Sequence, residues 1–318
     1  MRRTSFPPGL ARGAFVEVQA ALVANSPLAG TRLHWAELEV DAAFPEPLPG
    51  QFVMLTPPGA TEAGVILPRP FSIARAQPKN GGWRLGILYV PIGRGTRLMA
   101  LDRSGPWTLL GPLGRGFPTD HAGPALLVGG GRGTAPLVFL AEYFEARGRA
   151  VEFLIGARSR LDWAGPAEMG AALTRSRIWA TSEDGSVGTR GRVLDLFERE
   201  PELAAALARP GAALQACGPH GLLAAAGALG ESRGVPVHVS VEAHMACGTG
   251  ICRSCMIPRS AAGPRPRPGS NATYLVSCLE GPVVPAACVD WARDREIAAA
   301  ARDAELAAAC TGRNGGPA

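Results

Sequence analysis

Four cysteines near the carboxyl end of the chain are spaced as a set of ligands would be. Four residues separate Cys247 from Cys252, two separate Cys252 from Cys255, and Cys278 follows after twenty-two more. Plant-type [2Fe–2S] clusters have this spacing in their first three thiolates and take the fourth from a remote segment. We therefore expect Cys247, Cys252, Cys255 and Cys278 to bind a [2Fe–2S] cluster, and we expect the chain to move electrons.

Other uses of these cysteines remain open at this point. A structural zinc site usually has two short ligand pairs, whereas this region has one short pair and His244 as its nearby histidine. Disulfides fit poorly with an odd total of seven cysteines. Cys288 competes with Cys278 as the fourth ligand; we favour Cys278 because the preceding Tyr-Leu-Val-Ser indicates a short strand and hence a rigid platform. Gly248 and Gly250 permit the positive φ angles that a cluster loop needs.

The bulk composition limits the class of protein. The 318 residues suffice for two or three domains, and 47% hydrophobic with 19% charged residues is ordinary for a globular chain. The net charge of +5 comes almost wholly from arginine. Because the sequence contains no dense basic run with interleaved aromatic residues, we expect no nucleic-acid partner. No apolar stretch is long enough for a membrane span or a signal peptide, so we expect a cytoplasmic protein.

The first third of the chain predicts a small antiparallel β-barrel. Short apolar runs separated by Pro and Gly are typical of such barrels. These runs cover residues 15–24, 33–40, 51–55, 71–74, 83–90 and 107–110. We assign residues 10–118 to the barrel domain.

The next block alternates strands with helices, which predicts a parallel, doubly wound sheet. The expected strands are 125–128, 151–155, 178–181 and 213–216, and the expected helices are 135–147, 193–199 and 222–229. We assign residues 119–236 to this α/β domain, 237–289 to a small cluster domain, and 290–318 to a carboxyl-terminal helix and tail. The fold class is therefore multidomain, with a β-barrel, an α/β domain and a [2Fe–2S] domain.

Two motifs in the α/β domain stand where strands end. The loop Gly129–Thr134 joins a predicted strand to a helix, where glycines allow close approach and the helix start attracts phosphate; a plain tight turn would use the same residues. A second motif, Cys217-Gly-Pro, follows the last parallel strand at an edge where open sheets bind ligands. A buried packing role for Cys217 is the alternative. The candidate nucleotide-binding residues are Gly129, Gly130, Gly131, Gly133, Thr134, Cys217, Gly218 and Pro219.

Two weaker motifs lie in the barrel. An arginine in Arg69-Pro-Phe-Ser72 could contact a phosphate with its guanidinium fork, and Phe71 could lie against a planar ring. The turn Gly93-Arg-Gly95-Thr96 could present N–H groups to a pyrophosphate. Taken singly, each motif is equally compatible with an ordinary turn.

Four features in this order together resemble the ferredoxin–NADP reductase superfamily: a barrel with Arg69-Pro-Phe-Ser72, the glycine loop Gly129–Thr134, the Cys217-Gly-Pro motif and the four-cysteine set. Within it, the chain is similar to the electron-transfer subunits of heterodimeric bacterial dihydroorotate dehydrogenase. The carboxyl-terminal position of the cysteines supports this, as do the phrases at 111–117, 181–186 and 278–282. The likeness extends over roughly residues 14–285.

The resemblance implies that FAD binds between the barrel and the α/β domain. Its contacts would come from Arg69, Pro70, Phe71, Ser72, Leu88, Tyr89, Val90, Gly95 and Thr96. Two positions depart from the family pattern. Val90 stands where arginine is usual, so either that contact is lost or Arg94 or Arg97 supplies it. Arg132 stands in the glycine loop where an aliphatic residue is usual, which puts nicotinamide affinity in doubt.

The resemblance also implies a nicotinamide cofactor at the glycine loop. Glu183 and Asp184 would repel a 2′-phosphate and favour NAD, whereas Arg158 and Arg160 favour NADP. The implied function is electron transfer from the FMN of a dihydroorotate dehydrogenase catalytic subunit, through [2Fe–2S] and FAD, to NAD⁺ in pyrimidine biosynthesis, with a heterotetramer as the expected assembly. Alternatives are a reductase subunit of a hydrogenase, sulfite reductase or transhydrogenase complex, and a zinc-stabilised interaction module without flavin.

Overall fold

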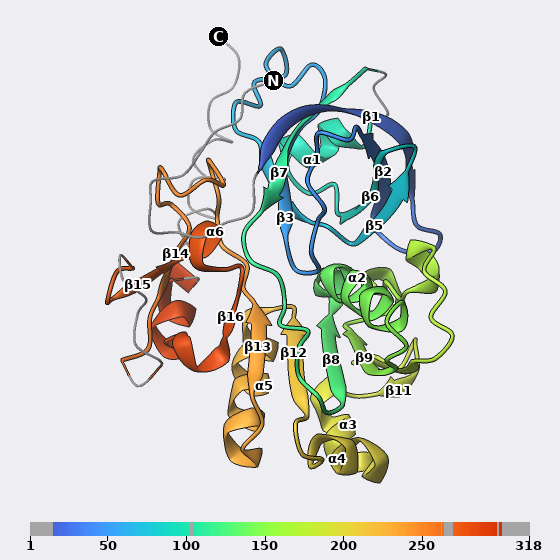
Figure 1. Cartoon of the computed structure of the whole chain (residues 1–318), viewed down its shortest axis with the longest axis vertical. Helices are drawn as coiled ribbons and strands as arrows, with labels where there is room; N and C mark the ends of the chain where they lie inside the picture. The colour runs from blue at the N-terminus through green and yellow to red at the C-terminus, as the bar shows by residue number, and fades with distance from the viewer. Residues whose placement is uncertain (1–14, 102–104, 262, 264–269, 298, 301–318) are drawn as a thin grey trace.

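The computed structural model describes residues 15–101, 105–261, 263, 270–297 and 299–300. Figure 1 shows an antiparallel barrel at one end, a parallel sheet at the other, and the cysteine-bearing segment along one side of both. The predicted fold class is confirmed. Among the helices of the described residues, none combines the length and apolar composition that crossing a bilayer requires.

The barrel is a seven-stranded antiparallel sheet with the strand order β4-β3-β7-β1-β2-β6-β5. Its strands are β1 (Val16–Pro27), β2 (His34–Val40), β3 (Phe52–Thr56), β4 (Arg69–Ser72), β5 (Arg75–Lys79), β6 (Gly82–Tyr89) and β7 (Trp107–Leu113). Alternation along β6 shows how the strands fill the barrel. Leu85, Ile87 and Tyr89 belong to the barrel core, whereas Leu88 packs with residues of the second domain. The short helix α1 (Arg94–Met99) follows β6.

The second domain has a seven-stranded sheet with the order β11-β10-β9-β8-β12-β13-β16. Its parallel strands are β8 (Ala125–Gly130), β9 (Val151–Ala157), β10 (Arg177–Ser182), β11 (Thr189–Arg190), β12 (Ala213–Cys217) and β13 (Val237–Ser240). The helices are α2 (Thr134–Glu145), α3 (Leu196–Arg199), α4 (Pro201–Leu207) and α5 (His220–Arg233). The predicted helix at 193–199 is a 3₁₀ turn, Val193–Asp195, that continues into α3.

Both faces of this sheet are covered, as the alternation along β8 requires. Leu127 packs in the core that contains α2, while Leu126 and Val128 pack in the core that contains α3, α4 and α5. Such two-sided burial explains why β8 is a continuous apolar run rather than an alternating one.

The cysteine-bearing segment follows β13. It contains the hairpin of β14 (Met256–Pro258) and β15 (Tyr274–Val276), the short helix α6 (Ser277–Glu280) and β16 (Val283–Pro285). Strand β16 returns to the parallel sheet and pairs antiparallel with β13. Of the expected carboxyl-terminal helix and tail, 290–318, residues 291–297 and 299–300 are helical, and residues 298 and 301–318 lie outside the described residues.

Helix α2 joins the barrel to the parallel sheet. Its Phe139 is 7% exposed and packs in the barrel core. Its Glu142 accepts hydrogen bonds from Nε and Nη2 of Arg75 on β5, at 3.0 and 2.8 Å. A third donor, Nη1 of Arg75, reaches the carbonyl oxygen of Met169 at 3.2 Å. The two domains are thus held together by a largely buried, forked ion pair as well as by apolar packing.

We expect Glu142→Ala to destabilise the protein by about 1–3 kcal/mol, because it leaves the Arg75 guanidinium partly buried without its carboxylate. Glu39→Ala is the matched control: Glu39 pairs with Arg84 within the barrel surface, where both side chains are about one-third exposed, so the loss should stay below about 1 kcal/mol. Chemical denaturation of both variants measures this. Equal losses would show that the interdomain pair is no stronger than a surface pair.

Candidate functional site

The cysteine loop lies against the outside of the barrel, and two glycines make this possible. Gly248 has a φ of +69°, and a Cβ atom there would lie 2.6 Å from Cγ of Met54 and 3.1 Å from Cδ1 of Leu113. Gly250 has a φ of +83°, and its Cβ would lie 2.4 Å from the side chain of Leu279. Both glycines are therefore required by backbone conformation and by space. The sequence identified the glycines but not the barrel residues they contact, which read simply as core.

Backbone N–H groups surround the thiols. Sγ of Cys247 accepts from the N–H groups of Thr249 and Cys252, at 3.4 and 3.5 Å. Sγ of Cys255 accepts from the N–H of Cys278 at 3.4 Å. Such donors stabilise a thiolate and, in clusters, adjust the reduction potential.

The ionisation of the thiols follows from these contacts. Burial raises the pKa of Cys247, but the N–H groups of Cys252 and Thr249 outweigh it and bring the pKa to about 6. The hydrogen bond from the Cys278 thiol lowers the pKa of Cys255 to about 6. The same hydrogen bond, together with burial, raises the pKa of Cys278. Two of the four sulfurs are therefore ready to act as thiolate ligands near neutral pH.

The four thiols fit a binuclear cluster in their chemistry. All of them are free, and Cys247, Cys255 and Cys278 lie close enough for each charge to affect the others. Cys252 is exposed, and its sulfur lies 3.2 Å from Oγ of Ser254. Within the described ranges, no three His, Cys, Asp or Glu side chains converge as ligands of one metal ion. A [2Fe–2S] cluster does not require three protein ligands on one metal ion, because its four thiolates are divided between two irons.

Cys288, the competing fourth ligand, lies elsewhere. It belongs to the core on the α5 side of the parallel sheet, together with Val284 and Val289. Cys278 and Cys255 instead share the small apolar cluster that contains Phe52 of β3. The structure therefore brings Cys278, and not Cys288, to the cysteine loop.

The glycine loop and the Cys-Gly-Pro motif meet at the carboxyl edge of the parallel sheet. Cys217 on β12 pairs with Gly129 on β8. A Cβ atom on Gly133 would lie 2.3 Å from the carbonyl oxygen of Cys217, so the start of α2 packs directly on the end of β12. Gly130 likewise has room for no side chain, because Leu222 and Pro219 lie 2.7 and 2.9 Å from its ideal Cβ. Gly218 has a φ of +159° beside them.

This edge has the features of a nucleotide site. Thr134, the first residue of α2, is fully buried, and its hydroxyl oxygen has no hydrogen-bond partner in the described part of the chain. Gly131 has a φ of +54° and open space around its ideal Cβ position. An unpartnered hydroxyl on the first residue of a helix and an open glycine turn beside it together suit a phosphate-bearing ligand.

Two side chains at this edge are neutral or are paired with another residue. Burial raises the pKa of the Cys217 thiol to about 12, so the group stays neutral and unreactive. Arg132 in the glycine loop lies 3.6 Å from Glu242, and both side chains are exposed. The charge that departs from the family pattern is thus balanced by a residue at the start of the cysteine-bearing segment.

The loops after β9 and β10 carry the residues expected to discriminate NAD from NADP. Hydrogen bonds connect these two loops. The N–H of Asp184 donates to the carbonyl of Arg158 at 3.3 Å, and the N–H of Arg160 donates to Oγ of Ser186 at 2.8 Å. Hydrogen bonds from the Ser186 hydroxyl and N–H lower the pKa of Asp184. Glu183 bonds through its N–H to the carbonyl of Ala157. Acidic and basic candidates therefore lie in one loop pair.

In the barrel, the structure brings the two weak motifs together. The guanidinium of Arg69 on β4 lies over the start of α1: a Cβ on Gly95 would be 2.9 Å from its Nε. Nη1 of Arg69 donates to the carbonyl of Leu67 at 2.5 Å. Oγ1 of Thr96 accepts from the N–H of Gly93 at 3.1 Å and so closes the turn. Arg69, Gly95 and Thr96 thus form one polar corner.

The remaining barrel candidates differ in how exposed their side chains are and in whether these already have partners within the protein. Phe71 is half-buried, with its ring centroid 6.2 Å from that of Tyr89. Tyr89 is 1% exposed and donates its hydroxyl proton to Asn25 at 2.7 Å, so its side chain is committed to the barrel core. Leu88 and Val90 are buried in the core shared with the second domain. Pro70 and Ser72 lie on β4 opposite Met54 and Phe52 of β3.

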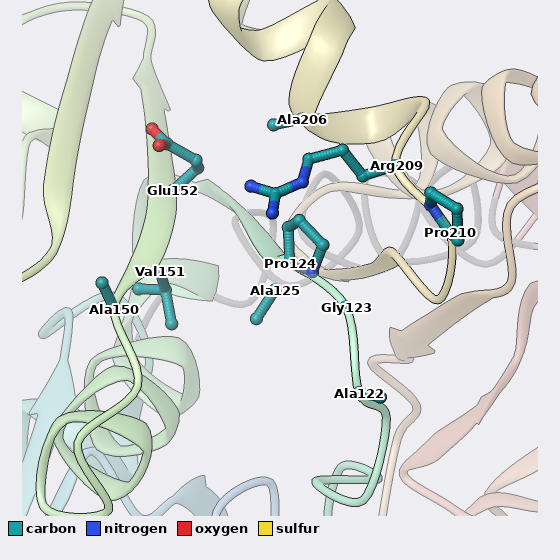
Figure 2. A pocket seen from close by; sticks show the side chains of 10 residues that line it. All are labelled: Ala122, Gly123, Pro124, Ala125, Ala150, Val151, Glu152, Ala206, Arg209 and Pro210. Atoms are coloured by element: carbon teal, nitrogen blue, oxygen red, sulfur yellow. The ribbon is translucent and has the colours of Figure 1, made fainter.

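A separate pocket of about 410 Å³ lies at the opposite, amino-terminal edge of the parallel sheet. Figure 2 shows the guanidinium of Arg209 and the carboxylate of Glu152 on two sides of it. The starts of β8 and β9 line this pocket, whereas the candidate nucleotide residues lie at their carboxyl ends. Open α/β sheets bind their ligands at the carboxyl edge, so this pocket is distinct from the candidate site.

Comparisons with known proteins agree on the relationship. Residues 242–290 match the protein-family model of the iron–sulfur cluster binding domain of dihydroorotate dehydrogenase B. The chain is 37% identical over 240 residues to "dihydroorotate dehydrogenase B (NAD(+)), electron transfer subunit" from Geobacillus thermodenitrificans, covering 74% of this chain and 84% of that protein. The protein of the same name from Lysinibacillus sphaericus is 34% identical over 243 residues, covering 74% and 85%.

Solved structures show the same fold. A structure of NADH-dependent reduced ferredoxin-NADP oxidoreductase matches with a TM-score of 0.70 at 22% identity, covering 88% of this chain and 92% of that chain. A ferredoxin reductase in carbazole 1,9a-dioxygenase matches with a TM-score of 0.57 at 22% identity, covering 71% and 69%. The fold, the cysteine set and the sequence identity to these relatives lead to one conclusion: the chain belongs to the family of electron transfer subunits of dihydroorotate dehydrogenase B.

Proposed function

We propose that this chain carries electrons between an FMN-containing dihydroorotate dehydrogenase subunit and NAD⁺, through a [2Fe–2S] cluster and FAD, in pyrimidine biosynthesis. One observation carries the proposal. Gly248 of the cysteine loop lies against Met54 of β3, and Met54 is paired with Pro70 of the Arg69-Pro-Phe-Ser motif on β4. The cysteine loop therefore contacts β3, and the proposed flavin motif lies on β4, the strand next to it.

The order of cofactors follows from their chemistry. Nicotinamide exchanges two electrons as a hydride, a [2Fe–2S] cluster exchanges one electron at a time, and a flavin does both, so the flavin has to lie between them. In this chain the polar corner of Arg69, Gly95 and Thr96 would hold the FAD phosphates. Phe71, half-buried beside this corner, would lie against the ring system. Tyr89 would contribute only its backbone, because its side chain is already engaged with Asn25.

The carboxyl edge of the parallel sheet would hold NAD. Thr134, with its unpartnered hydroxyl, and the open turn at Gly131 would receive the pyrophosphate. The Cys217 thiol would form an uncharged wall of the nicotinamide pocket, since burial keeps it protonated. We assign NAD rather than NADP because Glu183 and Asp184 would repel a 2′-phosphate.

The partner would dock at the exposed end of the cysteine loop. Ile251 is 85% exposed there and Cys252 is exposed beside it. This exposed apolar side chain, next to a cluster ligand, would be covered by the partner, which would exclude water between the two redox centres. Dihydroorotate would be oxidised on that partner, and the assembly we propose is a heterotetramer. We place it in the cytoplasm, where reducing conditions keep thiolate ligands available.

Reconstitution with the FMN-containing subunit tests the proposal. The complex, prepared without oxygen, should form NADH and orotate when it receives dihydroorotate and NAD⁺, and this chain should contain iron, acid-labile sulfide and FAD. A complex with all its cofactors that reduces no NAD⁺ would refute the proposed client. A folded chain without iron or flavin would refute the electron path itself.

Cys252→Ser should remove the cluster, abolishing dihydroorotate-driven NAD⁺ reduction while sparing NADH-driven reduction of a dye at the flavin. Cys288→Ser is the matched control, because Cys288 lies in a different core and its replacement should keep the cluster. Iron content and the two assays measure both variants. If Cys252→Ser keeps both activities, the cluster is not on the electron path.

Arg69→Ala should lower the FAD content of the purified protein, because it removes the guanidinium that lies over Gly95. Arg84→Ala is the control, since Arg84 pairs with Glu39 within the barrel sheet and should leave the flavin in place. The ratio of flavin absorbance to protein gives the answer. Full flavin content in Arg69→Ala would mean that the polar corner does not bind FAD.

A further inference from the structure

A buried ion pair lies beside the turn that carries Cys278. Nη2 of Arg259 is 2.7 Å from Oε2 of Glu280, and the two side chains are only 5% and 13% exposed. An isolated pair of this kind is costly to bury and contributes little net stability over apolar packing. Its position next to a cluster ligand therefore calls for a reason other than stability.

The carboxylate of Glu280 fixes the turn. Its second oxygen, Oε1, accepts the N–H of Val276 at 3.1 Å, and Cys278 lies midway between these two residues. The N–H of Gly281 closes the same turn on the carbonyl of Ser277 at 2.9 Å. Since the N–H of Cys278 also bonds to Sγ of Cys255, the orientation of this turn decides where the fourth thiol lies.

The guanidinium of Arg259 anchors the carboxylate to the hairpin. Its Nε donates to the carbonyl of Asn271 at 3.2 Å, and its backbone N–H donates to the carbonyl of Thr273 at 2.8 Å. Arg259 also forms a backbone bridge with Val289. The arginine is thus held on three sides, and it presents a fixed positive charge to Glu280.

We propose that Arg259 and Glu280 are positioning residues for the cluster: Glu280 orients the turn of Cys278, and Arg259 cancels the carboxylate charge that would otherwise oppose reduction of the cluster. This rests on the proposed [2Fe–2S] site. Reduction adds one electron, so a nearby uncompensated negative charge lowers the reduction potential and a nearby uncompensated positive charge raises it. The pair gives the cluster a rigid ligand without a net local charge.

Two charge-neutralising variants and their combination test the proposal on the full chain. Arg259→Gln should lower the reduction potential of the cluster, because it leaves the Glu280 carboxylate uncompensated. Glu280→Gln should raise the potential, because it leaves the Arg259 charge uncompensated, while the glutamine oxygen can still accept the Val276 N–H and keep the turn. The double variant should lie between the two single variants. Arg177→Gln is the control: Arg177 is an exposed arginine that pairs with Glu202 on the α/β domain, and its loss should leave the potential unchanged. Anaerobic redox titration, followed by the visible and electron paramagnetic resonance spectra, measures all four.

The outcomes separate this proposal from the proposed function. A wild-type chain without iron would overturn the proposed function. Iron-loaded Arg259→Gln and Glu280→Gln variants with the wild-type potential would overturn the ion-pair proposal alone. If Arg259→Gln loses its cluster and the double variant regains it, the charge compensation is supported. If both lose it, the potential of Glu280→Gln decides: a rise supports the proposal, and the wild-type value overturns it.

Discussion

The close approach of Gly248 to the barrel is the constraint on which the arrangement of this protein depends. The cysteine loop reaches strands β3 and β7 only because residue 248 has no side chain and adopts a left-handed conformation. With a Cβ atom at residue 248, either the loop or the side chains of Met54 and Leu113 would have to shift. Either shift would disturb the apolar cluster that contains Phe52, Met54, Leu113, Cys255, Val276 and Cys278. The contact between the cysteine loop and the barrel strands therefore depends on the absence of a side chain at residue 248.

The second constraint on the arrangement is the contact between the barrel and helix α2 of the α/β domain. Helix α2 begins at the glycine loop, packs Phe139 into the barrel core and accepts Arg75 through Glu142. One helix thus connects the candidate nucleotide site at its first turn with the barrel at its later turns. A displacement of either domain would move the glycine loop relative to the polar corner of Arg69. Hydride transfer demands such fixed geometry, because small misplacements cost large factors in rate.

Sequence patterns predicted the architecture well because they report on local burial. The apolar runs of the barrel, the alternation of strands and helices, and the spacing of Cys247, Cys252 and Cys255 each reflect a local requirement. The family membership, which follows from the order of motifs, is confirmed as well. The sequence did not predict strand β5, whose five residues, Arg75–Lys79, include charged side chains and Pro78, because its place at the sheet edge demands little apolar patterning.

Features that depend on distant contacts were beyond the sequence. The commitment of Tyr89 to Asn25, the contact of Gly248 with Met54, and the pairing of Arg259 with Glu280 each join segments that no local pattern connects. The choice between Cys278 and Cys288 is of the same kind. Both follow short apolar stretches, and only the return of β16 to the parallel sheet carries Cys288 away into the core beside α5.

That return of β16 has a consequence for the independence of the cluster segment. Strand β16 covers the outer edge of β13, so the segment supplies the final strand of a sheet whose other members precede it in the chain. Excising it would leave β13 as a bare edge with unpaired N–H and carbonyl groups, which invites aggregation. The cluster segment is therefore not an independent domain that could be moved to another protein without its sheet. Grafting it onto another reductase would require an acceptor sheet with an open edge that can pair antiparallel with β16.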